Sequence, residues 1–271
     1  ETRIRVKRKI GDSTFTQTYA LPKGSPILKV ENSVDWYERH VLVKAAFSLN
    51  LDADFATYEI PCGAIQRTTK PQTDAEKAKW EVPAMRWADL SDRNYGVSLL
   101  NDCKYGYDAQ PNQLRLTLLR GSEWPDPEAD EGLHTFIYAI YPHAGDWKQA
   151  QTVRRGYELN MPLQVVELNA DQMTQAGTLP PVGSLLDLGA ENLVLMALKQ
   201  SEDAPDGWIL RCYECHGEEA QLNLSSDLNL RIETAVDLLE QPVGEPIAEP
   251  ITKGQPIAVR PWEIVSFKIS R

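Results

Sequence analysis

The sequence is poor in the features that mark membrane, secreted and disulfide-rich proteins. No apolar run approaches the roughly 18 residues of a membrane-spanning helix, and the first residues lack the basic-then-apolar pattern of a signal peptide. Four cysteines in 271 residues are too few for a disulfide scaffold and favour a reducing compartment. We therefore expect a cytoplasmic protein with no membrane contact. The chain begins at Glu1 on a strand-like stretch, from which we expect a piece of a longer polypeptide.

Basic residues are also scarce. The chain has 28 Lys and Arg against 39 Asp and Glu, a net charge of −11. Because phosphate binding needs clustered Lys and Arg, we expect no nucleic-acid partner. The exception is the first ten residues, where basic side chains partly alternate with Ile4, Val6 and Ile10, as on the solvated face of an edge strand. These basic residues are Arg3, Arg5, Lys7, Arg8 and Lys9.

Motifs of catalysis are missing as well. There is no Gly-x-Ser-x-Gly elbow, no glycine-rich phosphate loop and no His-Glu-x-x-His pair. The acidic run at 123–131 is broken by prolines, so nothing holds two of its carboxylates across one sugar bond, as a glycosidase requires. His143 follows Pro142, and we interpret it as a turn or corner residue. The residues by themselves identify no catalytic group.

One short cluster invites a metal interpretation. Cys212, Cys215 and His216 would supply three soft ligands, but a structural zinc site needs a fourth, usually from a second Cys or His pair. The other two cysteines, Cys62 and Cys103, are distant in the sequence and do not form a second closely spaced pair. A packed strand followed by a turn at Gly217 explains the segment better. We expect no metal site in this chain.

Strand-like periodicity is what the sequence has in quantity. Segments of strand length are rich in β-branched and aromatic residues, and several alternate between apolar and polar positions. They are separated by turn residues, which favours an all-β sandwich or barrel. One helix is expected over 147–156, after an Asp146 cap. The predicted strands lie at 27–30, 41–49, 55–60, 96–100, 114–119 and 134–141.

The segment 174–184 contains Gly, Pro and Thr and is a plausible boundary. We predict a first domain over 1–178 and a smaller second domain over 179–271. The second domain should have strands of its own, while 229–239 is ambiguous between strand and loop. The strands predicted there are 193–198, 208–212, 221–224 and 264–269.

The most unusual stretch leaves an apolar strand at Leu100 and at once presents amide, carboxylate, ammonium and two phenols around Gly106. Sugar sites use such a mixture, because aromatic rings pack on C–H faces while carboxylates and amides bind hydroxyls. A polar turn held by tyrosine hydroxyls would have the same composition. The residue types alone leave both interpretations open.

At this stretch the sequence resembles a known family. The segment GVSLLNDCKYGYD (96–108) is similar to a signature of glycoside hydrolase family 38 α-mannosidases, in particular their cytosolic and vacuolar-type branch. Further segments resemble the same family in the same order along most of the chain. They are YEIPCGAIQR (58–67), EVPAMRWADL (81–90), LLR (118–120), PDPEAD (125–130), YAIYPH (138–143), LRCYE (210–214) and PWEIV (261–265).

The resemblance implies an all-β fold, a mutarotase-like β-sandwich (supersandwich) followed by a smaller β-sandwich domain. In the family the catalytic machinery lies in an N-terminal domain. There a zinc ion binds the sugar hydroxyls, and two Asp residues act in a retaining double displacement. None of those motifs occurs here. The resemblance therefore implies a non-catalytic C-terminal region, with no cofactor of its own, whose partners are the N-terminal catalytic domain of the same polypeptide and α-mannoside substrates.

The resemblance also implies that some side chains of the first domain reach the sugar cleft, and that the acidic run at 125–130 could contact the catalytic domain. The expected substrate-binding residues are Asn101, Asp102, Lys104, Tyr105, Tyr107, Asp108 and Arg120. A free-standing carbohydrate-binding or mutarotase-like module is the alternative, and a pure interaction scaffold is a third, weaker interpretation. The sequence leaves homo-oligomer formation open.

Overall fold

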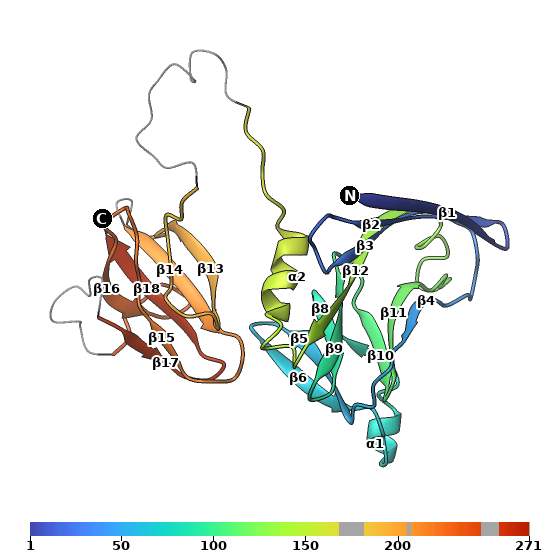
Figure 1. Cartoon of the computed structure of the whole chain (residues 1–271). Coiled ribbons are helices and arrows are strands. Elements are labelled where there is room, and N and C mark those ends of the chain that lie inside the picture. Colours follow the sequence, from blue (N-terminus) through green and yellow to red (C-terminus); the bar gives the residue numbers. More distant parts are fainter. Residues whose placement is uncertain (168–181, 205–206, 245–254, 271) are drawn as a thin grey trace. The chain divides into compact units, whose positions relative to one another are not determined.

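The chain forms two compact units, Glu1–Leu163 and Gln164–Arg271 (Figure 1). This computed structural model describes residues 1–167, 182–204, 207–244 and 255–270. The boundary predicted between 178 and 179 lies outside the described residues. Both units are built from antiparallel β-sheets, which confirms the predicted all-β class. Neither helix in the described ranges is long and apolar enough to cross a membrane.

An eight-stranded sheet is the largest element of the first unit. Its strands lie in the order β1-β2-β3-β12-β9-β8-β5-β6, and every neighbouring pair is antiparallel. The long strand β12 therefore pairs with β3 on one side and with β9 on the other. The strands are β1 (Thr2–Ile10), β2 (Ser13–Leu21), β3 (Leu28–Trp36), β5 (Phe55–Ile60), β6 (Gly63–Thr68), β8 (Trp87–Ser91), β9 (Tyr95–Asn101) and β12 (Gly132–Ala144).

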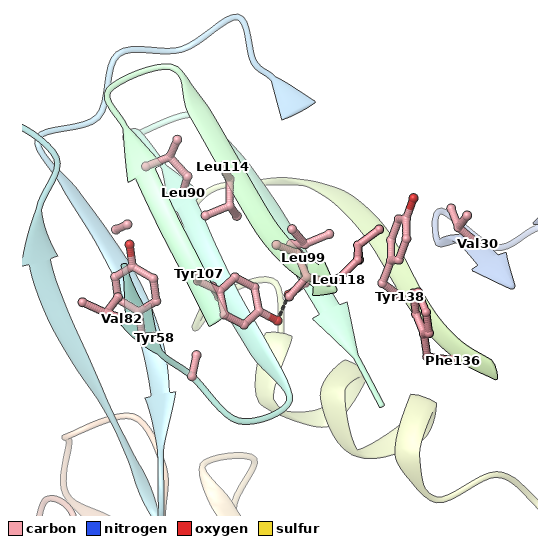
Figure 2. Packing of buried hydrophobic residues seen from close by; sticks show 14 of the residues in the cluster. Val30, Tyr58, Val82, Leu90, Leu99, Tyr107, Leu114, Leu118, Phe136 and Tyr138 are labelled. Atoms are coloured by element: carbon pink, nitrogen blue, oxygen red, sulfur yellow. Dashed lines mark hydrogen bonds between the residues drawn. The ribbon is translucent and has the colours of Figure 1, made fainter. Parts of the chain in front are cut away.

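A second, four-stranded sheet has the order β4-β11-β10-β7, with β4 (Val43–Ser48), β7 (Val82–Pro83), β10 (Gly106–Gln110) and β11 (Gln113–Leu119). The core of the unit draws on both sheets. Leu90 and Leu99 from the large sheet belong to one buried cluster with Tyr107, Leu114 and Leu118 from the small one (Figure 2). Burial of each such side chain stabilises the fold by about 1.5–3 kcal/mol.

The first strand lies at the edge of the large sheet, as its charge pattern predicts. β1 pairs only with β2, over the whole of its length. All its basic residues are exposed, whereas Val6 and Ile10 are half-buried. An edge strand has unpaired backbone groups along one side, and its charges disfavour pairing with another chain.

The main helix begins later than predicted. α2 spans Thr152–Asn160, not 147–156. Asp146 does form a cap-like turn, in which its carboxylate accepts from the backbone N–H groups of Lys148 and Gln149. However, Gln151 adopts a left-handed conformation with φ 55°, and this interrupts the turn before the helix. The short helix α1 (Asp74–Lys77) was not predicted; a Thr73–Glu76 capping box holds it.

The helix α2 covers the outer face of the large sheet at β8 and β9, so that β9 is buried on both faces. Gly156 faces the Trp87 ring, where an added Cβ would come within 3.1 Å of the indole Cδ1. Trp147, just before the helix, packs on Trp87 with 5.1 Å between ring centroids. Burial on both faces explains why 96–100 is mostly apolar, with Ser98 as its one polar residue.

The second unit has its own buried core within the described residues. A four-stranded sheet has the order β13-β14-β18-β16, and β15 pairs with β17. The ambiguous segment 229–239 contains a strand, β16. The elements are β13 (Leu193–Gln200), β14 (Trp208–Glu214), β15 (Ala220–Leu222), β16 (Arg231–Val236), β17 (Ile257–Val259) and β18 (Ile264–Ser270).

The buried Glu214 carboxylate organises the turn that follows β14. Its two oxygens accept backbone N–H groups of His216 and Gly217 at 2.8 Å, Glu218 at 3.2 Å and Trp262 at 3.0 Å. The Asn192 side-chain amide donates a further bond at 2.8 Å. One side chain thus satisfies four backbone donors of two turns. Within the segment Cys-Tyr-Glu-Cys-His, the glutamate therefore has the clearest structural role. The sequence pattern had drawn attention only to the Cys and His side chains.

Replacing Glu214 by Leu should destabilise the second unit by about 3 kcal/mol or more, because several buried N–H groups lose their acceptor. Hydrogen exchange in peptides from β14 to β15 measures this, and protection there should fall. Glu219→Leu is the matched control, since Glu219 is exposed and uses only its backbone oxygen. Equal protection in both variants would contradict the role of Glu214.

Candidate functional site

The candidate loop 102–105 is the point at which the chain passes from the large sheet to the small one. It leaves β9 at Asn101 and enters β10 at Gly106. The Asn101 side chain, 1% exposed, donates to the Met85 carbonyl at 2.7 Å and to the Tyr107 hydroxyl oxygen at 2.6 Å. Its Oδ1 accepts the Lys104 backbone N–H at 2.8 Å. Asn101 therefore fixes both ends of the loop.

Tyr107 lies inside the sandwich. It is fully buried, and its ring packs edge-on against Tyr58 with centroids 6.4 Å apart (Figure 2). Its hydroxyl donates to the Leu99 carbonyl at 3.4 Å, which joins the two sheets. Burial raises the pKa of the Tyr107 phenol, so the group stays protonated. Tyr107 is thus a support of the loop and presents no surface to a ligand.

Asp108 is also buried, at 5% exposure, and it is neutralised. Its Oδ2 lies 2.6 Å from the Lys44 ammonium, and its Oδ1 accepts the Arg115 Nε–H at 2.5 Å. Lys44 also approaches Glu81 at 3.1 Å. The attraction of two cations offsets the free-energy cost of burying this carboxylate. Asp108 and its partners form a polar network of the small sheet.

The loop between these supports is held from a second direction by β12. The Asp102 carboxylate accepts the Ile137 N–H at 2.9 Å, and the Asp102 N–H donates to the Ile137 carbonyl at 3.1 Å. The Lys104 ammonium lies over the Phe136 ring, 4.5 Å from its centroid. Tyr105 remains outside, with 57% of its surface exposed. The loop therefore presents one tyrosine ring on a fixed backbone.

Arg120 follows β11 and is exposed. No hydrogen bond or ion pair in the described part of the chain joins its side chain to residues 102–105. The adjoining loop folds on itself: the Asp130 carboxylate accepts the Gly121 N–H at 2.8 Å. Glu123 pairs with Arg39 at 2.9 Å and with His40 at 2.6 Å. Within the acidic run at 123–131, Asp126 and Asp130 thus accept local backbone N–H groups.

A buried Ser–His–Asp group was missed by the sequence analysis, which interpreted His143 as a turn or corner residue. His143 is in β12, and its Nε2 lies 2.8 Å from Asp89 Oδ2 and 3.2 Å from Ser98 Oγ. Ser98 Oγ also contacts Thr152 Oγ1 at 2.7 Å. A catalytic triad places the serine and the carboxylate on opposite ring nitrogens. Here both contact the same nitrogen under α2, so the group is structural, and no sequence spacing indicates it.

The resemblance implies a zinc ion in the catalytic domain and no metal ion in this chain. Across the described ranges, no group of three His, Cys, Asp or Glu side chains has the geometry to hold a metal ion. Cys212 is buried in the core of the second unit, and burial raises the pKa of its thiol to about 12. The residues described here therefore do not fit a zinc ion.

Asn101→Asp should destabilise the first unit by about 3 kcal/mol, because a carboxylate would face the Met85 carbonyl without a proton to donate. Urea unfolding followed by circular dichroism measures the change. Asn94→Asp is the matched control at an exposed turn and should shift stability by no more than about 0.5 kcal/mol. Equal stability of the two variants would show that Asn101 does not hold the loop.

Two family models match the chain. "Glycosyl hydrolases family 38 C-terminal domain" matches residues 1–128, and "Glycosyl hydrolases family 38 C-terminal beta sandwich domain" matches residues 192–267. Together they fall on the two compact units.

The chain is 36% identical over 233 residues to human alpha-mannosidase 2C1, covering 85% of this chain and 22% of that protein. It is 33% identical over 264 residues to the alpha-mannosidase of Saccharomyces cerevisiae, covering 89% and 23%. It thus spans less than a quarter of the length of these relatives. Among solved structures, an alpha-mannosidase from Enterococcus faecalis V583 has the same fold, with a TM-score of 0.77 at 18% identity over 94% of this chain and 28% of that one. The chain belongs to glycosyl hydrolase family 38 and corresponds to the C-terminal β region of that family's α-mannosidases.

Proposed function

We propose that this chain completes an α-mannosidase by packing on a catalytic domain of the same polypeptide and by presenting the 102–105 loop to the sugar. The observation that carries the proposal is the exposed Tyr105 ring on a loop fixed from two sides. An exposed aromatic ring on a rigid support is suited to the C–H face of a sugar. The relatives support the proposal because they are alpha-mannosidases of which this chain matches a C-terminal fraction.

The contributions of the loop residues differ in kind. Tyr105 is the contact residue, with Asp102, Lys104 and Arg120 as further candidates because they are not enclosed in the core. Asn101, Tyr107 and Asp108 are positioning residues, since their polar atoms are already bound inside the protein. A substrate hydroxyl could reach Tyr105 without a change in the backbone, whereas reaching Tyr107 would require opening the core.

Bond cleavage lies, in this proposal, in the catalytic domain. A zinc ion held there would bind sugar hydroxyls, and the residues of this chain would orient the sugar and exclude water around it. The parent protein would hydrolyse terminal α-mannosides with retention. Its place would be the cytoplasm, which the scarcity of cysteine favours.

Tyr105→Ala in the whole protein should lower kcat/KM on an aryl α-mannoside about tenfold, because the stacking surface is lost. Tyr105→Phe keeps the ring and should keep most of the activity. Tyr95→Ala, at a partly exposed tyrosine where β9 begins, is the matched control and should leave kcat/KM unchanged.

Unchanged kcat/KM in Tyr105→Ala would remove the proposed role of the loop. The 271-residue chain assayed alone with zinc addresses the other half of the proposal, and it should show no turnover. Turnover by that chain alone would place the chemistry within it and contradict an accessory role.

A further inference from the structure

A cavity of about 530 Å³ opens at one end of the first unit. Its walls come from β5 and β6, from the segment between α1 and β7, and from the β10–β11 hairpin. Figure 1 shows α1 at this end of the unit, close to β10. The volume lies within the range of about 300–1,000 Å³ that small-molecule sites occupy. The loop at 102–105 contributes no wall within the described residues.

Arg67 is the residue of this cavity that the fold leaves unexplained. Its Nε is completely buried and has no hydrogen-bond partner. No hydrogen bond or ion pair in the described part of the chain reaches the rest of the guanidinium. Most buried polar groups of native proteins have a partner. Arg67 is half-buried on the wall of a cavity, and its guanidinium has no hydrogen-bond partner within the described residues. This arrangement indicates an anionic ligand.

The charges around Arg67 reinforce this preference. The wall carries four basic residues, Arg67, Lys77, Lys79 and Arg115, against the acidic residues Glu76 and Asp108. Both carboxylates are already engaged. Asp108 is neutralised by Lys44 and Arg115. Glu76 accepts the backbone N–H groups of Gln72 and Thr73, and these bonds lower its pKa. Arg115 is paired with Asp108, and the Lys77 ammonium lies 4.0 Å from Asp74. Arg67 and Lys79 are therefore the basic residues of this wall that form no ion pair within the described residues.

Two aromatic side chains that line the cavity are exposed to solvent. Trp80 is 64% exposed and Phe55 is 54% exposed, although both are large and apolar. The Lys44 ammonium lies 5.5 Å from the Trp80 ring centroid, which favours one orientation of the indole. Exposed indole faces pack well on the C–H faces of sugar rings, while guanidinium groups bind oxyanions in a fork. The cavity combines both kinds of group.

From this combination we propose that the cavity binds an anionic sugar, a hexose that carries a phosphate or a carboxylate group. The sugar ring would pack on Trp80, and Arg67 would receive the oxyanion, with Lys79 adding positive charge. The inference goes beyond the proposed function, because it names a ligand chemistry for residues that the α-mannosidase proposal does not use. It holds whether or not the 102–105 loop contacts substrate.

Isothermal titration of the 271-residue chain tests this with four probes: mannose 6-phosphate, glucuronate, methyl α-mannoside and inorganic phosphate. At least one of the two anionic sugars should bind about tenfold more tightly than both the neutral sugar and the free anion. Which of the two binds identifies the phosphate or the carboxylate as the recognised group. Inorganic phosphate binding as tightly as the anionic sugars, or no saturable heat from any probe up to about 10 mM, would overturn the proposal.

Arg67→Met should weaken binding of the anionic sugar about tenfold and abolish its advantage over methyl α-mannoside. Trp80→Ala should weaken both sugars and leave any binding of inorganic phosphate unchanged. We expect both variants to fold, because no hydrogen bond or ion pair in the described part of the chain involves the Arg67 side chain and because Trp80 is exposed, and a thermal melt checks this directly. Arg93→Met, at an exposed arginine in the β8–β9 turn, is the matched control. Unchanged affinity in Arg67→Met would contradict the assignment.

Discussion

The hydrogen bond between the Asn101 amide and the Tyr107 hydroxyl joins the two sheets of the first unit at the place where the chain crosses from one to the other. Both groups are buried, so neither can exchange its partner for water, and breaking the bond would leave unsatisfied polar atoms. The five residues between them have little freedom, because Asp102 is also hydrogen-bonded to β12. This fixed crossing is what allows Tyr105 to be exposed and ordered at once.

Much of the fold follows from short-range pattern. The alternation in 114–119 predicts β11, and the basic alternation at the start predicts an edge strand, because both depend on side-chain period alone. Helix α2 shows where this fails. Asp146 forms the expected cap, but the helix begins only after Gln151, which adopts a left-handed conformation. The intervening Trp147 packs on Trp87 of the sheet. The local signal therefore marks the turn and not the start of the helix.

The sequence likewise predicts only part of the candidate site. The unusual composition of 101–108 correctly marks a polar crossing, but composition cannot tell which polar group points inward. The structure places Asn101, Tyr107 and Asp108 in the interior and leaves Tyr105 outside. The buried His143 group and the Arg67 cavity were both missed, because their members come from separate strands and have no spacing in common. Glu214 was overlooked for another reason: its neighbouring cysteines draw attention to metal chemistry, whereas its own partners are backbone N–H groups.

The central claim is that a fixed loop of this chain meets a catalytic domain that lies elsewhere in the same polypeptide. Hydrogen-exchange mass spectrometry of peptides covering 101–108 tests it most directly, by comparing the 271-residue chain alone with the same segment in the whole protein. We expect additional protection at 102–105 in the whole protein, with β1–β2 peptides unchanged. Equal protection of 102–105 in both would contradict it, because a loop that meets a catalytic domain must lose solvent contact.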